Sequence, residues 1–160
     1  MKLFRRNPDD RKLADSALYD ERSFFGAFSK DFKAAKYEVI IESPYLTLRR
    51  TTDLEPLCAG LIRKGVRIHV YTRNPAHHDG YLKIQAIKSI QILKSIGVHV
   101  IQCNDMRHRK LAVIDDQILW EGSLNMLSHS NSREIMRRTN SRSMCQEMLR
   151  FTKLTSSIKC

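Results

Sequence analysis

Several features that would place a protein in a specialised class are missing from this sequence of 160 residues. No run approaches the roughly 18 apolar residues that a membrane-spanning helix needs, which excludes integral membrane association through such a helix. No linker rich in glycine, serine or proline divides the chain and no segment repeats, so we expect one domain. The N-terminal residues 1–8 are basic, but no apolar run follows them, so they do not resemble a secretory signal.

Cysteine is scarce and scattered. Cys58, Cys103, Cys145 and Cys160 form no C-x-x-C pair, which disfavours a zinc ribbon or a thioredoxin-type redox site. Because a chain of this length can bury a core without disulfides, we expect free thiols, most of them buried, in a cytoplasmic protein. We expect neither a bound metal ion nor a cofactor.

Acidic residues are also under-represented, at 17 Asp and Glu against 28 Lys and Arg, which gives a net charge of +11. A globular composition with this excess predicts attraction to polyanions, nucleic acid first and an anionic membrane surface second. A two-metal nuclease would need several clustered carboxylates. The adjacent pairs Asp9-Asp10 and Asp115-Asp116 are better interpreted as turn residues.

Hydrophobic periodicity predicts a layered α/β/α domain around a central mixed β-sheet. The predicted helices cover 15–36, 53–64, 81–96 and 142–157. The predicted strands cover 37–43, 66–71, 98–101, 110–115, 117–121 and 134–139. The stripe Phe24, Phe25, Phe28 and Phe32 recurs at helical spacing, and we interpret it as core rather than a base-stacking platform. We expect residues 15–160 to form the domain and residues 1–14 an N-terminal extension.

The segment 107–134 carries the residues with chemical potential. His108 and Lys110 are two apart at the start of a strand, so their side chains project to one face. After a turn at Asp115-Asp116 the chain returns, and Ser123 and Asn125 arrive beside them. An imidazole, an ammonium group, a hydroxyl and an amide then converge, which is a set suited to a phosphate group.

The pattern His108-x-Lys110-x-x-x-x-Asp115, followed by Gly122-Ser123-x-Asn125, resembles the HKD motif of the phospholipase D superfamily. The single copy is similar to the small, nuclease-like branch of that superfamily. Segment 41–47 also resembles an early strand of that superfamily and the loop after it, and segments 64–68 and 97–100 resemble the starts of two later strands. The resemblance therefore covers residues 15–155.

The resemblance implies a metal-independent phosphodiesterase. His108 would attack phosphorus to form a phosphohistidine, and a second histidine would protonate the leaving oxygen and later activate water. It also implies catalytic-site positions for Lys110, Ser123 and Asn125. Glu134 matches a family carboxylate that holds the catalytic histidine, and Asp115 takes a supporting role in the turn.

The chemistry needs two motifs, and no other histidine of this chain has a lysine two residues on. Small members of the family solve this by forming a homodimer, so the resemblance predicts one composite site built by two subunits. A self-complementary two-fold interface is the commonest oligomer geometry.

Basic residues surround the motif. Arg107, Arg109, Arg133 and Arg137 are predicted to bind substrate, which makes a nuclease acting on DNA or RNA with little sequence specificity the first hypothesis. The alternatives are a non-catalytic nucleic-acid-binding module recruited to a helicase or restriction-type partner and, less favoured, a phospholipid phosphodiesterase. We interpret His77-His78-Asp79 as a polar surface loop rather than a metal site.

Overall fold

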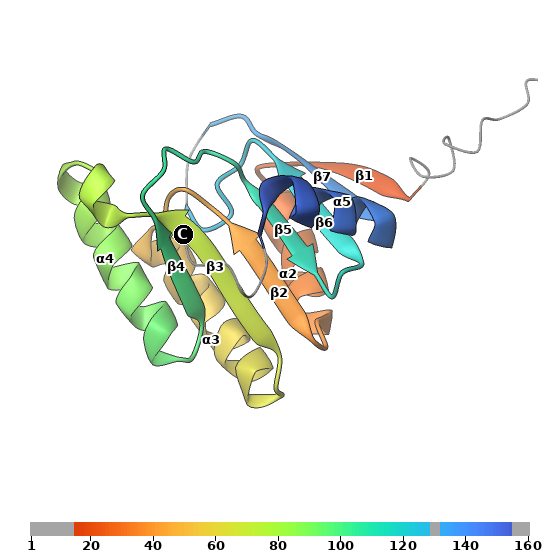
Figure 1. Ribbon diagram of the computed structural model, residues 1–160, viewed down its shortest axis with the longest axis horizontal. Helices are drawn as coiled ribbons and strands as arrows, with labels where there is room; N and C mark the ends of the chain where they lie inside the picture. The colour runs from red at the N-terminus through yellow and green to blue at the C-terminus, as the bar shows by residue number, and fades with distance from the viewer. Residues whose placement is uncertain (1–14, 129–131, 155–160) are drawn as a thin grey trace, which may run out of the picture.

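A computed structural model describes residues 15–128 and 132–154, and these form a seven-stranded mixed sheet between helices (Figure 1). The strands are β1 (Ser16–Asp20), β2 (Glu38–Glu42), β3 (Arg67–Arg73), β4 (His99–Cys103), β5 (Leu111–Ile114), β6 (Ile118–Gly122) and β7 (Ile135–Asn140). The helices are α2 (Phe24–Ala34), α3 (Leu48–Arg63), α4 (Gly80–Ser95) and α5 (Arg142–Thr152), with a short 3₁₀ turn η1 (Pro75–His77). The predicted layered α/β class is confirmed.

The order of the strands is β1-β7-β6-β5-β2-β3-β4. β2, β3 and β4 run parallel and are joined through α3 and α4, whereas the other neighbouring strands pair antiparallel. Helices α2, α3 and α4 cover one face of the sheet and α5 covers the other (Figure 1). Glu42 at the end of β2 pairs with Leu111 at the start of β5. We call this end of the sheet, where β2, β3, β4 and β6 finish and β5 and β7 begin, the site edge.

The phenylalanine stripe belongs to the core. Phe24, Phe28 and Phe32 are fully buried, and Phe24 and Phe28 pack edge-on against Trp120 of β6. The indole N–H of Trp120 donates a hydrogen bond of 2.8 Å to Asp31, so the buried ring keeps a polar partner. The interpretation of this stripe as core rather than a stacking platform is confirmed.

Three predicted helices have boundaries that differ in the structure. Residues 16–20 form β1, an edge strand paired with β7, and the Asp20 carboxylate then accepts backbone N–H groups of Arg22 and Ser23 to make the turn into α2. Helix α3 begins at Leu48 rather than near residue 53, because Gln85 of α4 accepts the Leu48 N–H and supports the earlier start. The predicted last helix ends at Thr152, and residues 155–157 lie outside the described residues.

One cysteine does not match the expectation of free thiols. Cys58 and Cys145 are buried free thiols, and burial raises the pKa of each to about 12. Cys103 is disulfide-bonded, so the expectation of free thiols throughout is wrong there. Cys160, the remaining cysteine, lies outside the described residues. Every helix in the described part of the chain is too short or too polar to span a lipid bilayer.

A histidine pair at the opposite end of the sheet leads to a pH prediction. His69 on β3 is 5% exposed, stacks on His99 of β4 and lies 3.4 Å from a carboxylate oxygen of Glu38. Burial lowers the pKa of His69, with the charge of Glu38 opposing the shift. The unfolded chain therefore takes up a proton below about pH 6.5 that the native chain resists, and the free energy of unfolding falls as the pH drops through that range.

Denaturant titrations between pH 8 and pH 5 measure this loss. His69→Phe is expected to flatten the profile, because it removes the titrating group from its buried position. His99→Gln, at the exposed partner, is expected to retain most of the slope. Identical slopes for the wild type and His69→Phe would contradict the assignment.

Candidate active site

His108 and Lys110 lie at the site edge, immediately before β5. The Nζ atom of Lys110 is 2.6 Å from Nδ1 of His108 and 2.6 Å from the His108 carbonyl oxygen. His108 is exposed, whereas Lys110 is 8% exposed. Burial lowers the pKa of Lys110, and the negative charge of Glu134 opposes that shift. The pair thus presents an accessible imidazole beside a largely buried amine.

Ser123 and Glu134 lie at the same edge, on the segments that follow β6 and precede β7. The Ser123 hydroxyl donates to the Glu134 carboxylate and accepts the backbone N–H of Ile135 at 3.0 Å. Hydrogen bonds from Ser123 and then Ser132, with the charge of Lys110, lower the pKa of Glu134. Glu134 therefore binds the serine of the motif directly and acts on its lysine through charge.

Asn125 lies in a loop that the core holds in place. Leu124, Met126 and Leu127 are buried, and the Leu127 N–H donates to the Ser43 hydroxyl beyond β2 at 3.3 Å. This bond ties the loop after β6 to the loop after β2. The side-chain oxygen of Asn125 is buried and has no hydrogen-bond partner among the described residues, which leaves an acceptor at the site unsatisfied.

The glycine of the motif is required by a close approach of two strands. A Cβ atom added to Gly122 would lie 2.1 Å from the carbonyl oxygen of Ile135 and 2.9 Å from Cα of Met136. Only glycine lets β6 approach β7 this closely, and the same approach brings Ser123 to Glu134.

Asp115 lies at the opposite end of β5 from Lys110. Both Asp115 and Asp116 have positive φ, as a tight turn between antiparallel strands requires. The Asp115 carboxylate accepts the backbone N–H groups of Lys36, Tyr37 and Glu38 at 2.7, 2.8 and 2.9 Å. The structure therefore places Asp115 where it anchors the start of β2, outside the group around His108.

Replacing Asp115 with alanine is expected to lower the free energy of unfolding by about 2–4 kcal/mol, because three backbone donors lose a charged acceptor. Below the melting temperature, activity per folded molecule should stay near that of the wild type. Denaturant unfolding and initial rates at low temperature test both parts. Asp116→Ala, in the same turn, is the comparison variant, because it removes contacts with Arg142 and Gln146 of α5 but keeps the three backbone hydrogen bonds of Asp115. A loss of activity in fully folded Asp115→Ala would show a direct role in the chemistry.

The predicted substrate arginines have protein partners in the single chain. Arg107 and Arg109 alternate with the motif residues and pair with Glu42, a fully buried carboxylate, at 3.4 and 3.0 Å. Burial raises the pKa of Glu42, and the two arginines oppose that shift. Arg133 pairs with Glu21 at 3.1 Å, and Arg137 donates to the Ser16 hydroxyl at 3.2 Å. Substrate binding by these four residues stays a prediction.

Three residues at the site edge were not predicted as site residues. Tyr45 follows β2, Arg73 ends β3 and His78 follows η1. The Tyr45 ring lies 6.1 Å from the His108 ring and 5.2 Å from the His78 ring, centroid to centroid. His78 is 6% exposed, so the interpretation of residues 77–79 as a surface loop is wrong for His78. No sequence spacing indicates this group, because Tyr45 lies in the loop after β2, whereas Arg73 and His78 lie at the end of β3 and in the segment that follows it.

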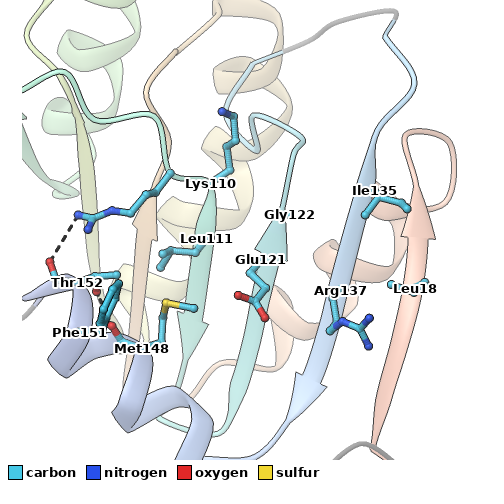
Figure 2. Close-up of a pocket in the computed structure, with 11 residues that line it drawn as sticks. Leu18, Lys110, Leu111, Glu121, Gly122, Ile135, Arg137, Met148, Phe151 and Thr152 are labelled. Carbon is cyan, nitrogen blue, oxygen red and sulfur yellow. Dashed lines mark hydrogen bonds between the residues drawn. The ribbon is translucent and has the colours of Figure 1, made fainter.

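An open groove of about 570 Å³ lies on the face of the sheet that α5 covers. Leu111, Met148 and Phe151 line one side, and Glu121 and Arg137 project from neighbouring strands on the other (Figure 2). Lys110 stands at its upper end with the ammonium group directed away from it (Figure 2). Lys110 and Gly122 of the motif line this groove, as do Arg109 and Arg137 of the predicted substrate residues. The remaining predicted catalytic residues at the site edge do not line it: His108, Ser123, Asn125 and Glu134.

The family model for the cardiolipin synthase, PLD-like domain matches residues 28–154. The chain belongs to the phospholipase D-like family. The matched range contains the whole PLD-like motif, from His108 to Asn125, together with Glu134. None of the curated proteins matches the sequence.

Solved structures share the PLD-like fold. NucT from Helicobacter pylori superposes with a TM-score of 0.70 at 17% identity, over 86% of this chain and 92% of NucT. Nuc from Salmonella typhimurium, a phospholipase D family member, gives 0.69 at 14% identity, over 86% and 92% of the two chains. TrmBL2, an archaeal chromatin protein whose structure shows a mode of DNA binding, gives 0.61 at 8% identity, over 87% of this chain and 51% of TrmBL2.

Proposed function

We propose that this PLD-like protein is a metal-independent nuclease that hydrolyses DNA or RNA with little sequence specificity. One observation carries the proposal: His108 and Lys110 lie in contact at the same sheet edge as Ser123 and Glu134. An exposed imidazole beside a cation and a hydroxyl supplies a nucleophile and groups that neutralise and orient a phosphate.

The reaction proceeds in two displacements. An imidazole nitrogen of His108 attacks phosphorus in line, the P–N bond forms and the P–O bond to the leaving group breaks. A protonated second histidine gives its proton to the departing oxygen. That histidine, now neutral, then takes a proton from water, whose oxygen attacks phosphorus and releases His108.

The contact between Lys110 and His108 sets a condition on this chemistry. A protonated lysine can only donate, so Nδ1 of His108 accepts and the neutral ring carries its proton on Nε2. Attack through Nε2 needs that proton on Nδ1 instead. A phosphate anion makes the exchange possible, because it draws Lys110 toward its own oxygens and frees Nδ1. Water then takes the proton from Nε2 and returns a proton to Nδ1.

The second histidine comes from a second subunit in this proposal. The chain has one His-x-Lys motif, so a two-fold dimer with facing site edges would bring two copies of His108, Lys110, Ser123 and Asn125 together. In the single chain the carboxylate of Glu134 is occupied by the Ser123 and Ser132 hydroxyls, and we assign its contact with a catalytic histidine to the assembled site.

Nucleic acid is the favoured substrate because of charge. The net charge of +11 doubles in a dimer, and polyanion binding by phosphate contacts is the property such a field supplies. NucT and Nuc, which share the fold, support the same class. The similarity to TrmBL2 supports a second candidate function, a non-catalytic DNA-binding module. Such a module would act when a helicase or restriction-type partner recruits it.

The experiment incubates the protein with single- and double-stranded DNA, RNA and a short-chain phospholipid, each with and without EDTA. Nucleic-acid cleavage that survives EDTA is expected. Loss of cleavage in EDTA would overturn the metal-free mechanism, binding without cleavage would support the DNA-binding module, and cleavage of phospholipid alone would exclude the nuclease. Sedimentation of the active fractions tests the dimer, since a monomer with full activity would overturn the shared site.

A further inference from the structure

The group formed by Tyr45, Arg73 and His78 contains a cation without a carboxylate. Arg73 is 8% exposed, and its Nη1 donates to the Tyr45 hydroxyl at 3.2 Å while Nη2 contacts the Met106 sulfur at 3.4 Å. Its Nε is buried without a hydrogen-bond partner, and no acidic residue in the described ranges forms an ion pair with it. A buried guanidinium is costly unless an anion pairs with it.

His78 adds a second unsatisfied donor or acceptor next to Arg73. Its side chain is 6% exposed, and Nε2 is buried with no hydrogen-bond partner. Burial and then the charge of Arg73 lower the pKa of His78. An anion bound between the two side chains would offset that repulsion, since it would pair with Arg73 and accept a hydrogen bond from protonated His78.

Tyr45 connects this group to the candidate catalytic histidine. The ring lies 5.2 Å from His78 and meets His108 edge-on at 6.1 Å, so the two histidines flank one aromatic side chain. Met106, which covers the guanidinium, is 73% exposed and its flexible thioether can move aside. An anion that reaches Arg73 would therefore sit one aromatic ring away from the group that His108 attacks.

We infer that Tyr45, Arg73 and His78 form a second phosphate subsite, which holds the phosphodiester next to the one presented to His108. The inference rests on the proposed nuclease function and specifies its substrate: a nucleotide chain with at least two consecutive phosphates, rather than an isolated phosphodiester. Arg73 supplies the charge and the planar donor pair, and His78 and the Tyr45 hydroxyl supply further hydrogen bonds.

A binding measurement with catalytically inactive protein tests this subsite independently of catalysis. Fluorescence anisotropy with His108→Asn protein compares a short oligonucleotide with two consecutive phosphates and the same oligonucleotide with one phosphate replaced by a neutral methylphosphonate. Adding Arg73→Met is expected to weaken binding of the two-phosphate probe about 10- to 100-fold and to leave the one-phosphate probe unchanged. The slope of log K against log salt should fall by about 0.7 for the two-phosphate probe.

Arg67→Met is the matched control, because Arg67 lies at the opposite end of the same strand, is largely exposed and loses the same charge. It should leave both affinities nearly unchanged. Arg73→Lys keeps the charge and should restore part of the affinity, which separates a lost contact from a folding defect. The subsite would be overturned if Arg73→Met weakened the affinity for both probes equally or for neither. It would also be overturned if the parent protein did not bind the two-phosphate probe more tightly than the one-phosphate probe.

Hydrolysis of bis(p-nitrophenyl) phosphate by protein with His108 intact tests the proposed function separately, because that compound has one phosphate and cannot reach both subsites. Arg73→Met is expected to keep the wild-type rate on it while losing about 10-fold or more in kcat/KM on the oligonucleotide. No hydrolysis of either compound would overturn the nuclease, and the anisotropy result would still decide the subsite.

Discussion

Replacing His108 with asparagine is expected to lower kcat/KM for nucleic-acid hydrolysis by at least about a thousandfold. In the proposed dimer it removes the nucleophile of the first displacement and also the second subunit's histidine, which acts as acid and base. The substitution should leave the fold intact, since His108 is exposed and lies outside the sheet. Asparagine also keeps a side-chain oxygen that can accept from Lys110, and the Lys110 bond to the backbone carbonyl of residue 108 is unaffected. Initial rates on a labelled oligonucleotide measure the effect.

His99→Asn is the matched control for this change, because His99 is an exposed histidine at the opposite end of the sheet. Its activity should equal that of the wild type. Thermal unfolding should show little difference between the two variants, and affinity for uncleaved nucleic acid should persist in His108→Asn. Wild-type rates in folded His108→Asn would contradict the phosphohistidine mechanism.

Adding a single methyl group at Gly122 is expected to produce the largest loss of stability. In Gly122→Ala the new Cβ would lie 2.1 Å from the Ile135 carbonyl oxygen and 2.9 Å from Cα of Met136, which are backbone atoms of β7 that no side-chain rotation can move. It would also lie 2.8 Å from the Met136 sulfur. The two strands must separate, and we expect the free energy of unfolding to fall by about 3 kcal/mol or more. Ser123 would move away from Glu134 at the same time, so activity should fall even in the folded fraction.

Gly26→Ala is the control, because the same substitution at this position should stabilise the protein. Gly26 lies in the interior of α2 with nothing within 4 Å of an added Cβ, so alanine should stabilise the protein by about 0.5–1 kcal/mol. Denaturant unfolding of the two variants compares the same chemical change at a crowded and an open position. A loss below about 1 kcal/mol in Gly122→Ala would contradict the required close approach.

Sequence patterns over short distances along the chain were sufficient to predict much of this structure. The period of the phenylalanine stripe predicted a buried helix face, and the alternation of strands and helices predicted the layered class. The motif spacing predicted that Lys110 and Ser123 lie at the same end of the sheet as His108, although it also included Asp115, which lies at the opposite end. These features depend on residues close together in the sequence. A strand pair joined by the turn at Asp115-Asp116 returns the chain to its own start, so residues before β5 and after β6 meet at one edge whatever else the fold does.

Other features depended on contacts between segments far apart in the sequence. β1 is a strand because β7 pairs with it, and Asp115 holds the backbone of residues 36–38 across about 78 positions. Arg109 pairs with Glu42 of β2, and Arg107 pairs with the same carboxylate in addition to the nearby Asp105. The net charge of the sequence indicates that cations are in excess, but not which of them are neutralised by buried acids.

The Tyr45, Arg73 and His78 group shows the same limit most clearly. Its members follow or end different elements, and the parallel pairing of β2 and β3 brings their ends to one edge. Nothing in the residue spacing marks them, because a loop position carries no periodic signal and the burial of a loop side chain is decided by the neighbouring loops. The sequence alone therefore predicted the chemical group that would attack a phosphate, and the packing of the end of β3 against the neighbouring loops revealed beside it a cation without an acidic partner in the described part of the chain.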